Sequence, residues 1–387
     1  MSQQKIQERL HDGSASIGVL GGGQLGMMMI EAANEIGVIV HCLDPNPAAP
    51  CAKIATTFTV GDFNNYDDVY QFGKDKKVLT IEIENVNIDA LEVLEQEGVK
   101  VYPQSSVLKI IKDKGVQKQF YVDSNVPTAP FQLVEGKTAL VQGDLSYPFV
   151  QKLRVGGYDG KGVQLIRNKE ELNFAFDAPS VIESMIDFEK EISIIVARNV
   201  SGQLAVFPAV ECEFSKEANL VEFQFSPAAI SLEIEQKAIE IASSIIQSLE
   251  LVGILAVEFF LTKQGDLLVN EIAPRTHNSG HHTIECCETS QFEQHLRAVL
   301  NLELGSTRLV CPAAMVNLLG EPSYNGTAHY EGLEEVLQIP GVFVHLYGKE
   351  KTSPNRKMGH VTILGKSMEE IKAKAALVKS GLRCISK

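Results

Sequence analysis

A short apolar run that ends in a cluster of glycines limits most strongly how this chain can fold. Ile17–Leu20 is typical of a buried strand, glycines stand at positions 21, 22, 23 and 26, and a helical pattern then continues to Ile36. The next strand begins at Val38 and ends at Asp44, and a later apolar run covers Val78–Ile81. Strands and helices that alternate in this way predict a parallel, doubly wound sheet for the N-terminal third.

The glycine turn indicates a phosphate site without identifying the phosphate. Glycines let backbone N–H groups approach an anion at the N-terminus of a helix. The G-x-G-x-x-G spacing, with Asp44 where a ribose-binding acid would lie, fits a dinucleotide site. A phosphate monoester or a tight turn without a ligand fits the same pattern. The chemistry of the remaining chain has to separate these alternatives.

The composition of the 387-residue chain argues against several classes of partner. The net charge is −14 and no block of Lys and Arg stands out, which argues against nucleic acid. No apolar run is long enough to cross a membrane, and residues 1–13 are polar, so we expect a loose N-terminal extension on a cytoplasmic protein. The seven cysteines include no Cys-x-x-Cys pair, which indicates reduced thiols rather than disulfides or a zinc site.

A second glycine-rich segment follows a strand that carries a lysine. Lys152 lies on the same face as Val150 of the expected strand, and positions 156–162 contain four glycines. Such a loop can close over the phosphates of a nucleotide above a fixed lysine, although a solvated hairpin tip is the alternative. Downstream, the connector Glu183–Ile186 could read an adenine edge through its backbone, and Glu191 could accept ribose hydroxyls.

Two acidic residues flank a later turn. A hairpin centred between Gln264 and Gly265 makes Glu258 and Glu271 direct partners, and both have apolar neighbours. Like charges directly opposite each other destabilise a hairpin, and a bound divalent cation relieves the repulsion. We therefore expect a magnesium site, with a protonated carboxyl or a different register as the alternatives.

The segment after Glu271 is unusually polar. Arg275 offers a planar fork suited to bicarbonate, carboxylate or phosphate, and His277 and Asn278 add donors. Zinc is disfavoured because His281 and His282 are adjacent and no Cys or acid completes a tetrahedral set. His282 is expected to be structural.

Four motifs together resemble one family. They are Gly-Gly-Gln-Leu-Gly at 22–26, Gly-Gly-Tyr-Asp-Gly-Lys-Gly at 156–162, Asn-Glu-Ile-Ala-Pro-Arg-x-His-Asn-Ser-Gly-His at 270–281, and Arg-Lys-Met-Gly-His at 356–360. The chain is similar through nearly its whole length to the N5-carboxyaminoimidazole ribonucleotide synthase family of ATP-grasp ligases. The third motif is the most specific of the four.

The resemblance implies an ATP-grasp fold that combines α/β and α+β parts. The implied divisions are an N-terminal doubly wound domain at 1–112, a small lid at 113–186, a central ATP-grasp domain at 187–310 and a β-rich C-terminal part at 311–387. A homodimer is also implied. The ligands would be ATP, Mg²⁺ or Mn²⁺, bicarbonate and 5-aminoimidazole ribonucleotide. ATP would convert bicarbonate to carboxyphosphate, and the substrate amine would capture its carboxyl group or released carbon dioxide, as a step of purine synthesis.

The resemblance also implies roles for individual residues. The catalytic set is Arg275, His277, Asn278 and Lys349, and the metal ligands are Glu258 and Glu271. The ATP-binding set is Lys114, Lys152, Gly157, Tyr158, Asp159, Gly160, Lys161, Gly162, Val163, Glu183, Ser184, Met185, Ile186, Glu191, Asn270 and Glu271. The ribonucleotide set is Gly23, Gln24, Leu25, Glu84, Asn85, Tyr158, Asp159, Lys349 and Arg356.

The chain departs from the family pattern at a few positions. Met27 and Lys114 stand where arginine is common, and Cys212–Phe214 replaces an Asn-x-His on the nucleotide side. The loop before Arg356 is one residue longer than usual. The alternatives are another ATP-grasp ligase, a dinucleotide-dependent oxidoreductase suggested by the first turn, and a non-catalytic binding module. The oxidoreductase leaves the second glycine loop and the opposed acids unexplained.

Overall fold

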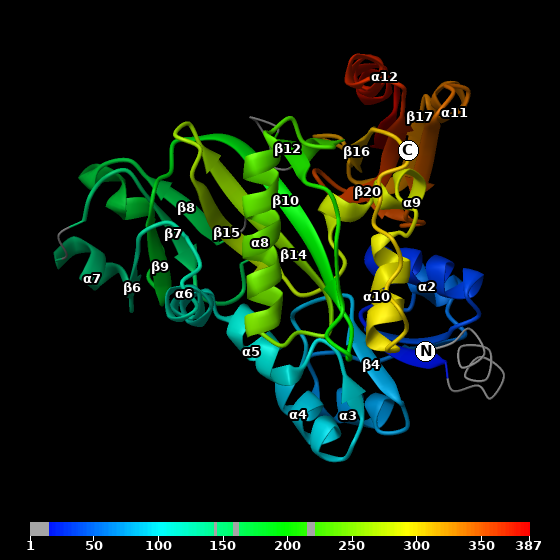
Figure 1. Ribbon diagram of the computed structural model, residues 1–387, viewed down its shortest axis with the longest axis horizontal. Helices are drawn as coiled ribbons and strands as arrows, with labels where there is room; N and C mark the ends of the chain where they lie inside the picture. The colour runs from blue at the N-terminus through cyan, green and yellow to red at the C-terminus, as the bar shows by residue number, and fades with distance from the viewer. Residues whose placement is uncertain (1–14, 143–144, 158–161, 215–220) are drawn as a thin grey trace.

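A computed structural model describes residues 15–142, 145–157, 162–214 and 221–387 of the chain (Figure 1). The expected N-terminal extension and positions 158–161 of the second glycine loop therefore lie outside the described residues. Within the described ranges, no helix is both long and apolar enough to cross a membrane.

The N-terminal part is a parallel sheet with the strand order β3-β2-β1-β4-β5, which confirms the doubly wound prediction. The chain winds outward from β1 in one direction and from β4 in the other, so the switch point lies between these two strands. Their carboxyl ends, where ligands bind in such sheets, lead into Gly21 and Glu82. The elements are β1 (Ser16–Leu20), α2 (Gln24–Glu35), β2 (Ile39–Asp44), η1 (Pro50–Lys53), β3 (Thr57–Val60), α3 (Tyr66–Gly73), β4 (Val78–Ile81), α4 (Ile88–Gln96), β5 (Lys100–Val101) and α5 (Ser105–Lys112).

A smaller antiparallel sheet with the order β6-β9-β7-β8 follows. Phe149, Ile166 and Ile182 fill its core. Its elements are α6 (Lys114–Asp123), β6 (Phe131–Val134), α7 (Lys137–Gln142), β7 (Phe149–Leu153), β8 (Val163–Ile166), η2 (Lys169–Phe174) and β9 (Ser180–Ser184).

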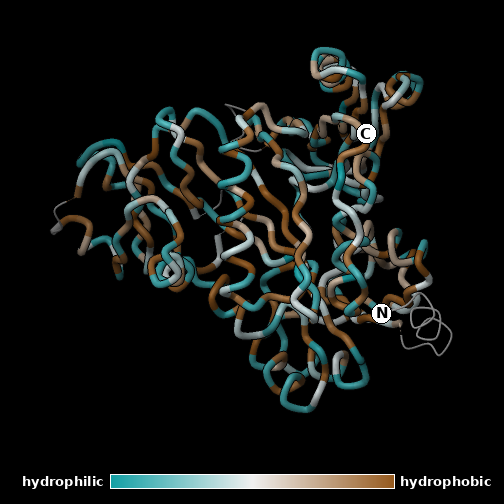
Figure 2. Tube along the Cα trace, viewed as in Figure 1, coloured by the Kyte–Doolittle hydropathy of each residue, from teal (hydrophilic) through white to brown (hydrophobic). Residues whose placement is uncertain are grey.

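The central sheet has the order β15-β14-β10-β12-β13-β16-β20-β18, with β11 paired to β10. Helix α8 packs against β10 and β14 through Ile245 and Ile246, and Figure 2 shows hydrophobic residues concentrated along these strands. The elements are β10 (Phe188–Arg198), β11 (Leu204–Val206), β12 (Val210–Phe214), β13 (Val221–Ser226), α8 (Leu232–Ser248), β14 (Gly253–Thr262), β15 (Leu267–Ala273), η3 (Asn278–Gly280), α9 (Thr283–Cys286) and α10 (Gln291–Val299).

The C-terminal part continues the central sheet through β16, β20 and β18, while β19-β17-β21 form a separate small sheet. Strands are therefore abundant here, as predicted, but helix α12 was not foreseen. Its buried face, Ile371, Ala375 and Val378, packs over β16 and β20. The elements are β16 (Ala313–Leu319), β17 (Gly326–Glu331), α11 (Leu333–Leu337), β18 (Val342–Leu346), β19 (Lys351–Thr352), β20 (Lys357–Leu364), α12 (Met368–Gly381) and β21 (Arg383–Ser386). The domain limits inferred from the sequence stay predictions.

Candidate active site

The β14–β15 hairpin places Glu258 directly opposite Glu271, which confirms the predicted pairing, but its turn is centred on Gln264 rather than between Gln264 and Gly265. The register shifts between Glu258 and Phe259, so that Asn270 is the extra residue of a β-bulge. The side chains of Glu258 and Glu271 keep 33% and 43% of their surface exposed, which leaves oxygens that a cation can reach.

The charges of three glutamates in this site are coupled. Burial, reinforced by Glu271, raises the pKa of Glu258 to about 7. Burial and then Glu258 raise the pKa of Glu191, on neighbouring strand β10, to about 7 as well. Burial would also raise the pKa of Glu271, but Lys114 and Lys152 outweigh it and lower that pKa. A divalent cation between Glu258 and Glu271 would favour ionisation of both.

Lysines from two other elements converge on the same hairpin. Lys114, at the start of α6, forms an ion pair with Glu271. Lys152 on β7 lies with its Nζ 2.8 Å from Oδ1 of Asn270 and 2.9 Å from Oε2 of Glu183. These contacts connect the small sheet to the central sheet and place two cations beside the opposed acids.

The position of Lys114 is fixed by its neighbours. Asp113 accepts hydrogen bonds from the N–H groups of Gly115 and Val116 and so caps α6. The same carboxylate receives a two-pronged contact from Arg154, whose backbone oxygen accepts from the Lys114 N–H at 2.9 Å. The end of β7 therefore holds the first turn of α6 in place. Asp113 and Arg154 are not among the site residues predicted from the sequence.

The polar segment after β15 reaches back toward the N-terminal sheet. Nε of Arg275 lies 3.1 Å from Oε1 of Glu84, which follows β4. Nε2 of His277 lies 3.6 Å from Oε1 of Glu258. Arg275 and His277 thus connect the acids of the hairpin to the switch point of the parallel sheet, where the sequence predicts the ribonucleotide.

Two residues outside the predicted site residues hold this segment. The side chain of Gln291 accepts from the His277 N–H at 2.9 Å and donates to the His277 carbonyl at 2.7 Å. The amides of Asn278 and Asn317 exchange hydrogen bonds of 2.9 and 3.1 Å. The fully buried Gln291 and the buried Asn317 therefore fix the backbone of His277 and the side chain of Asn278.

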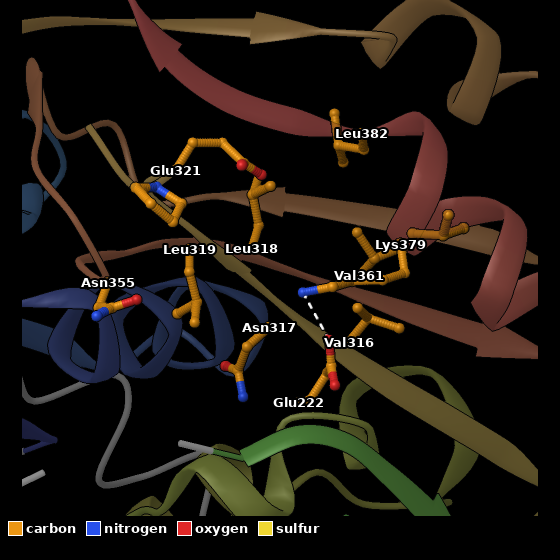
Figure 3. Close-up of a pocket in the computed structure, with 13 residues that line it drawn as sticks. Glu222, Val316, Asn317, Leu318, Leu319, Glu321, Asn355, Val361, Lys379 and Leu382 are labelled. Carbon is orange, nitrogen blue, oxygen red and sulfur yellow. Dashed lines mark ion pairs between the residues drawn. The ribbon is translucent and has the colours of Figure 1, made fainter. Parts of the chain in front are cut away.

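Asn317 also lines a cavity of about 360 Å³ on the C-terminal side (Figure 3). Residues of β16, β20 and α12 form much of its lining, and an ion pair of 2.9 Å joins Glu222 to Lys379 across it. None of its lining residues is an expected ATP or metal ligand. The cavity therefore touches the candidate site at Asn317, but none of the charged residues of that site lines it.

The glycine turn is surrounded by two carboxylates. Asp44 accepts from the N–H groups of Gly22 and Asn46, both at 2.8 Å, so one of its oxygens holds the glycine turn and the other holds the chain just after β2. Glu82 accepts from the Leu25 N–H at 3.2 Å, at the start of α2. Burial raises the pKa of Glu82, and nearby Arg275 and Lys349 counteract part of this effect. Asp44 is therefore a structural partner of the turn, which weakens the dinucleotide alternative.

Several other predicted site residues make contacts that do not point to a ligand, or lie outside the described residues. The carboxylate of Glu183 is buried against lysines, so its side chain does not face a nucleotide as an ATP contact would. Met185, just beyond β9, is half exposed and suits an adenine edge better. Lys349 donates to the carbonyl of Lys357, at the start of β20, and Arg356 donates to the carbonyl of Lys351, on β19. The predicted contacts at Tyr158, Asp159, Gly160 and Lys161 lie outside the described residues.

Family models of known proteins match three successive segments of the chain. A family model described as an ATP-grasp domain matches residues 119–292. A ribonucleotide synthetase preATP-grasp domain matches 14–112, and a phosphoribosylaminoimidazole carboxylase C-terminal domain matches 313–374.

Individual relatives are similar over nearly their whole length. The N5-carboxyaminoimidazole ribonucleotide synthase of Bacillus subtilis (strain 168) is 38% identical over 364 residues, which cover 92% of this chain and 93% of that protein. The crystal structure of N5-carboxyaminoimidazole ribonucleotide synthetase from Thermotoga maritima superimposes with a TM-score of 0.89 at 42% identity, over 96% of this chain and 100% of that one. The Aspergillus clavatus synthase, crystallised with ADP and 5-aminoimidazole ribonucleotide, gives a TM-score of 0.86 at 31% identity, over 95% and 98% of the chains.

Proposed function

The chain belongs to the N5-carboxyaminoimidazole ribonucleotide synthase family and has the ATP-grasp fold, and from this premise we propose how its residues carry out the family's reaction. It is an ATP-dependent ligase that carboxylates 5-aminoimidazole ribonucleotide in purine synthesis. One observation carries the assignment of roles: residues of opposite charge from distant parts of the chain converge at one site. They are the opposed acids Glu258 and Glu271, the lysines Lys114 and Lys152, and Arg275 with its partner Glu84.

The reaction consists of two transfers. A bicarbonate oxygen attacks the γ-phosphorus of ATP, the bond from that phosphorus to the bridging oxygen breaks, and ADP leaves. The substrate amine then takes the carboxyl carbon, directly or as released carbon dioxide, while phosphate departs and the nitrogen loses a proton. Both transfers build negative charge on oxygens, so fixed cations and donors are the main requirement.

We propose that Glu258 and Glu271 hold Mg²⁺ together with phosphate oxygens of ATP. In the described part of the chain, no cluster of three or more His, Cys, Asp or Glu side chains could hold a metal alone. Two carboxylates with substrate phosphates are nevertheless the usual surroundings of Mg²⁺ in such enzymes. The pair fits because both side chains are partly exposed and because a neighbouring positive charge would stabilise the ionised form of Glu258, whose pKa is raised by burial and by Glu271. When bound, the ion would neutralise charge on the transferred phosphoryl group.

Lys114 and Lys152 are assigned to the phosphates, and Met185 and Ile186 to the adenine. Glu191 is assigned to the ribose of ATP, where its high pKa suits a hydroxyl partner better than an anion. Arg275, His277 and Asn278 are assigned to bicarbonate and carboxyphosphate. This assignment is supported by the hydrogen bonds from Gln291 and Asn317, which fix the segment beside Glu258.

The ribonucleotide is assigned to the switch point of the N-terminal sheet. There the glycine turn, Glu84 and Asn85 follow the carboxyl ends of β1 and β4. The Arg275–Glu84 contact would bring the substrate amine toward carboxyphosphate. Lys349 and Arg356 are assigned to the same substrate, and the family resemblance also suggests a homodimer.

The deciding experiment measures phosphate release from ATP by the purified protein. Release should require both bicarbonate and 5-aminoimidazole ribonucleotide, and the acid-labile carboxylated ribonucleotide should form in equal amount. Phosphate release that needs a different amine or a different carboxylate would assign the chain to another ATP-grasp reaction.

A further inference from the structure

A lysine that lies outside the expected nucleotide site has an unusual place next to it. Lys118 follows Lys114 by one helical turn on α6, so both side chains project from the same face of the helix. Two like charges at this spacing disfavour a helix unless each has a partner. Here Lys114 is paired with Glu271 and Lys118 with Glu183, so the two cations are neutralised by acids from different strands.

The environment of Lys118 keeps it away from solvent. The residue is 2% exposed, its Nζ lies 2.9 Å from Oε1 of Glu183, and it donates to Oγ1 of Thr128 at 2.5 Å. The Thr128 hydroxyl donates in turn to the Val269 carbonyl, on the strand that carries the bulge. Burial lowers the pKa of Lys118, while Glu183 opposes that effect. A lysine so enclosed cannot contact ATP without breaking these bonds.

Glu183 is shared between two lysines. Its Oε1 faces Lys118 and its Oε2 faces Lys152, each at 2.9 Å, and the carboxylate is 4% exposed. Lys152 is more accessible, at 12% of its side-chain surface, and also contacts Asn270 next to the expected phosphate position. One buried carboxylate therefore restrains one lysine that stays in place and one that can move toward a ligand.

We propose that Lys118 is a positioning residue that neutralises Glu183. The ammonium group of Lys152 can then move from Glu183 to the phosphates of ATP. This inference rests on the proposed ATP site. A buried carboxylate needs a cation, and if Lys152 were the sole partner it would have to leave Glu183 unpaired whenever it bound a phosphate. With Lys118 present, Glu183 remains paired in both states.

The test is the affinity for ATP without bicarbonate or ribonucleotide, measured by calorimetry with Mg²⁺ present. Lys118→Met keeps an apolar stem and removes the charge, so Glu183 should retain Lys152. We expect the Kd for ATP to rise at least tenfold, with a larger change in the KM for ATP than in kcat. In the double variant Lys118→Met with Glu183→Gln, the carboxylate that pairs with Lys152 is gone and only the hydrogen bond to Asn270 remains, so the Kd should return to within threefold of the wild-type value.

Lys374→Met is the matched control. Lys374 is also mostly buried, pairs with Glu370 at 2.8 Å and donates to two carbonyls, but it lies on α12. The Lys374→Met protein should be somewhat less stable than the wild type and should keep the wild-type Kd for ATP. Equal loss of affinity in the single and double variants would show that Lys118 acts only through the fold or touches ATP itself, and would overturn the inference.

Two further outcomes are decisive. A folded Lys118→Met protein that binds ATP within twofold of wild type would refute the positioning role while leaving the proposed function intact. If Lys118→Met does not fold, the double variant decides alone, and a tenfold loss of its ATP affinity would contradict the inference. A wild-type protein that does not bind ATP would instead refute the proposed function, and the inference with it.

Discussion

Glu258 and Glu271 face each other across the β14–β15 ladder, and the bulge at Asn270 lies immediately beside the pair. Their environments differ, because Glu271 has Lys114 as a partner while burial and the charge of Glu271 raise the pKa of Glu258. Glu271 is thus ionised before any cation binds, whereas Glu258 is only partly ionised near neutral pH until a cation arrives. This difference suits a metal that enters and leaves with the nucleotide.

Glu271→Gln is expected to abolish turnover while the protein stays folded. The change removes one anionic oxygen ligand from the proposed metal site and the partner of Lys114. It also removes the repulsion on Glu258, so the free energy of unfolding without ligand should change by no more than about 1 kcal/mol. Steady-state rates over a range of Mg²⁺ concentrations and urea unfolding would measure the two effects.

A suitable control is Glu370→Gln, which removes a carboxylate paired to a lysine on α12, far from the hairpin. Its turnover should equal that of the wild type. Near-normal activity of Glu271→Gln at ordinary Mg²⁺ concentrations would refute the assignment of the opposed acids.

Arg275 is expected to act on the reacting anion, and its geometry can be tested by two substitutions. Arg275→Lys keeps the charge but loses the planar fork, and Arg275→Ala loses both. Removing a donor of this kind typically costs roughly 3 kcal/mol, about a hundredfold in rate, so Ala should be slower than Lys and both much slower than wild type. The measurement is bicarbonate-dependent turnover of the three proteins.

Affinity for ATP separates this role from a nucleotide contact. Arg275 contacts Glu84 and the Thr276 carbonyl, whereas the residues assigned to the phosphates, adenine and ribose of ATP lie on α6, on β7, just after β9 and on β10. ATP should therefore bind to Arg275→Ala with nearly unchanged affinity. Lost ATP binding would reassign Arg275 to the nucleotide, and near-normal turnover would remove it from the mechanism.

The sequence predicted the hairpin and the parallel sheet because both depend on local spacing. A short polar turn between two apolar strands predicts a hairpin, and strand–glycine–helix order predicts a parallel sheet. The turn is centred on Gln264, however, and this spacing alone would pair Glu258 with Asn270. The bulge at Asn270 was not predictable, since it adjusts the ladder so that Asn270 meets Lys152 from another sheet. The extra residue also restores the predicted pairing of Glu258 with Glu271.

Residues that act through long-range contacts escaped prediction. Lys118 had a local signal, its position one turn after Lys114, but its partner Glu183 is 65 positions further along the chain. Asp44 carried a misleading signal, because an acid after the second strand fits a ribose and also fits a cap for the glycine turn. The local sequence alone cannot distinguish these two uses of a carboxylate.

ATP with Mg²⁺ should stabilise the protein against thermal unfolding, and NAD or NADP should not. A ligand at one hundred times its Kd adds about 2.7 kcal/mol to the free energy of unfolding. The melting temperature should therefore rise by several degrees with Mg²⁺–ATP, and less with ATP plus a chelator. Stabilisation by NAD alone would revive the oxidoreductase alternative that the G-x-G-x-x-G turn suggested.

His295 predicts how stability depends on pH. Its Nε2 lies 2.8 Å from Oγ1 of Thr80, both residues are fully buried, and the contact joins α10 to β4 of the N-terminal sheet. Burial lowers the pKa of His295 to about 4. An unfolded histidine titrates near 6.5, so between about pH 6.5 and 4 the unfolded state binds the proton that the folded state refuses. Stability should therefore fall as the pH drops through this window.

Proton uptake by His295 in the unfolded state lowers the free energy of unfolding by about 1.36 kcal/mol for each pH unit below 6.5. At pH 5 the free energy of unfolding should therefore be about 2 kcal/mol lower than at pH 7 because of this residue alone. His295→Gln can keep the bond to Thr80 but cannot take up the proton. We expect the variant to be less stable at pH 7 and to lose about 2 kcal/mol less than wild type between pH 7 and pH 5, measured by urea unfolding. His282, whose pKa burial also lowers to about 4, should give a similar difference in His282→Gln. Equal losses in wild type and both variants would mean that other groups govern acid unfolding, because neither histidine would then be taking up a proton as the chain unfolds.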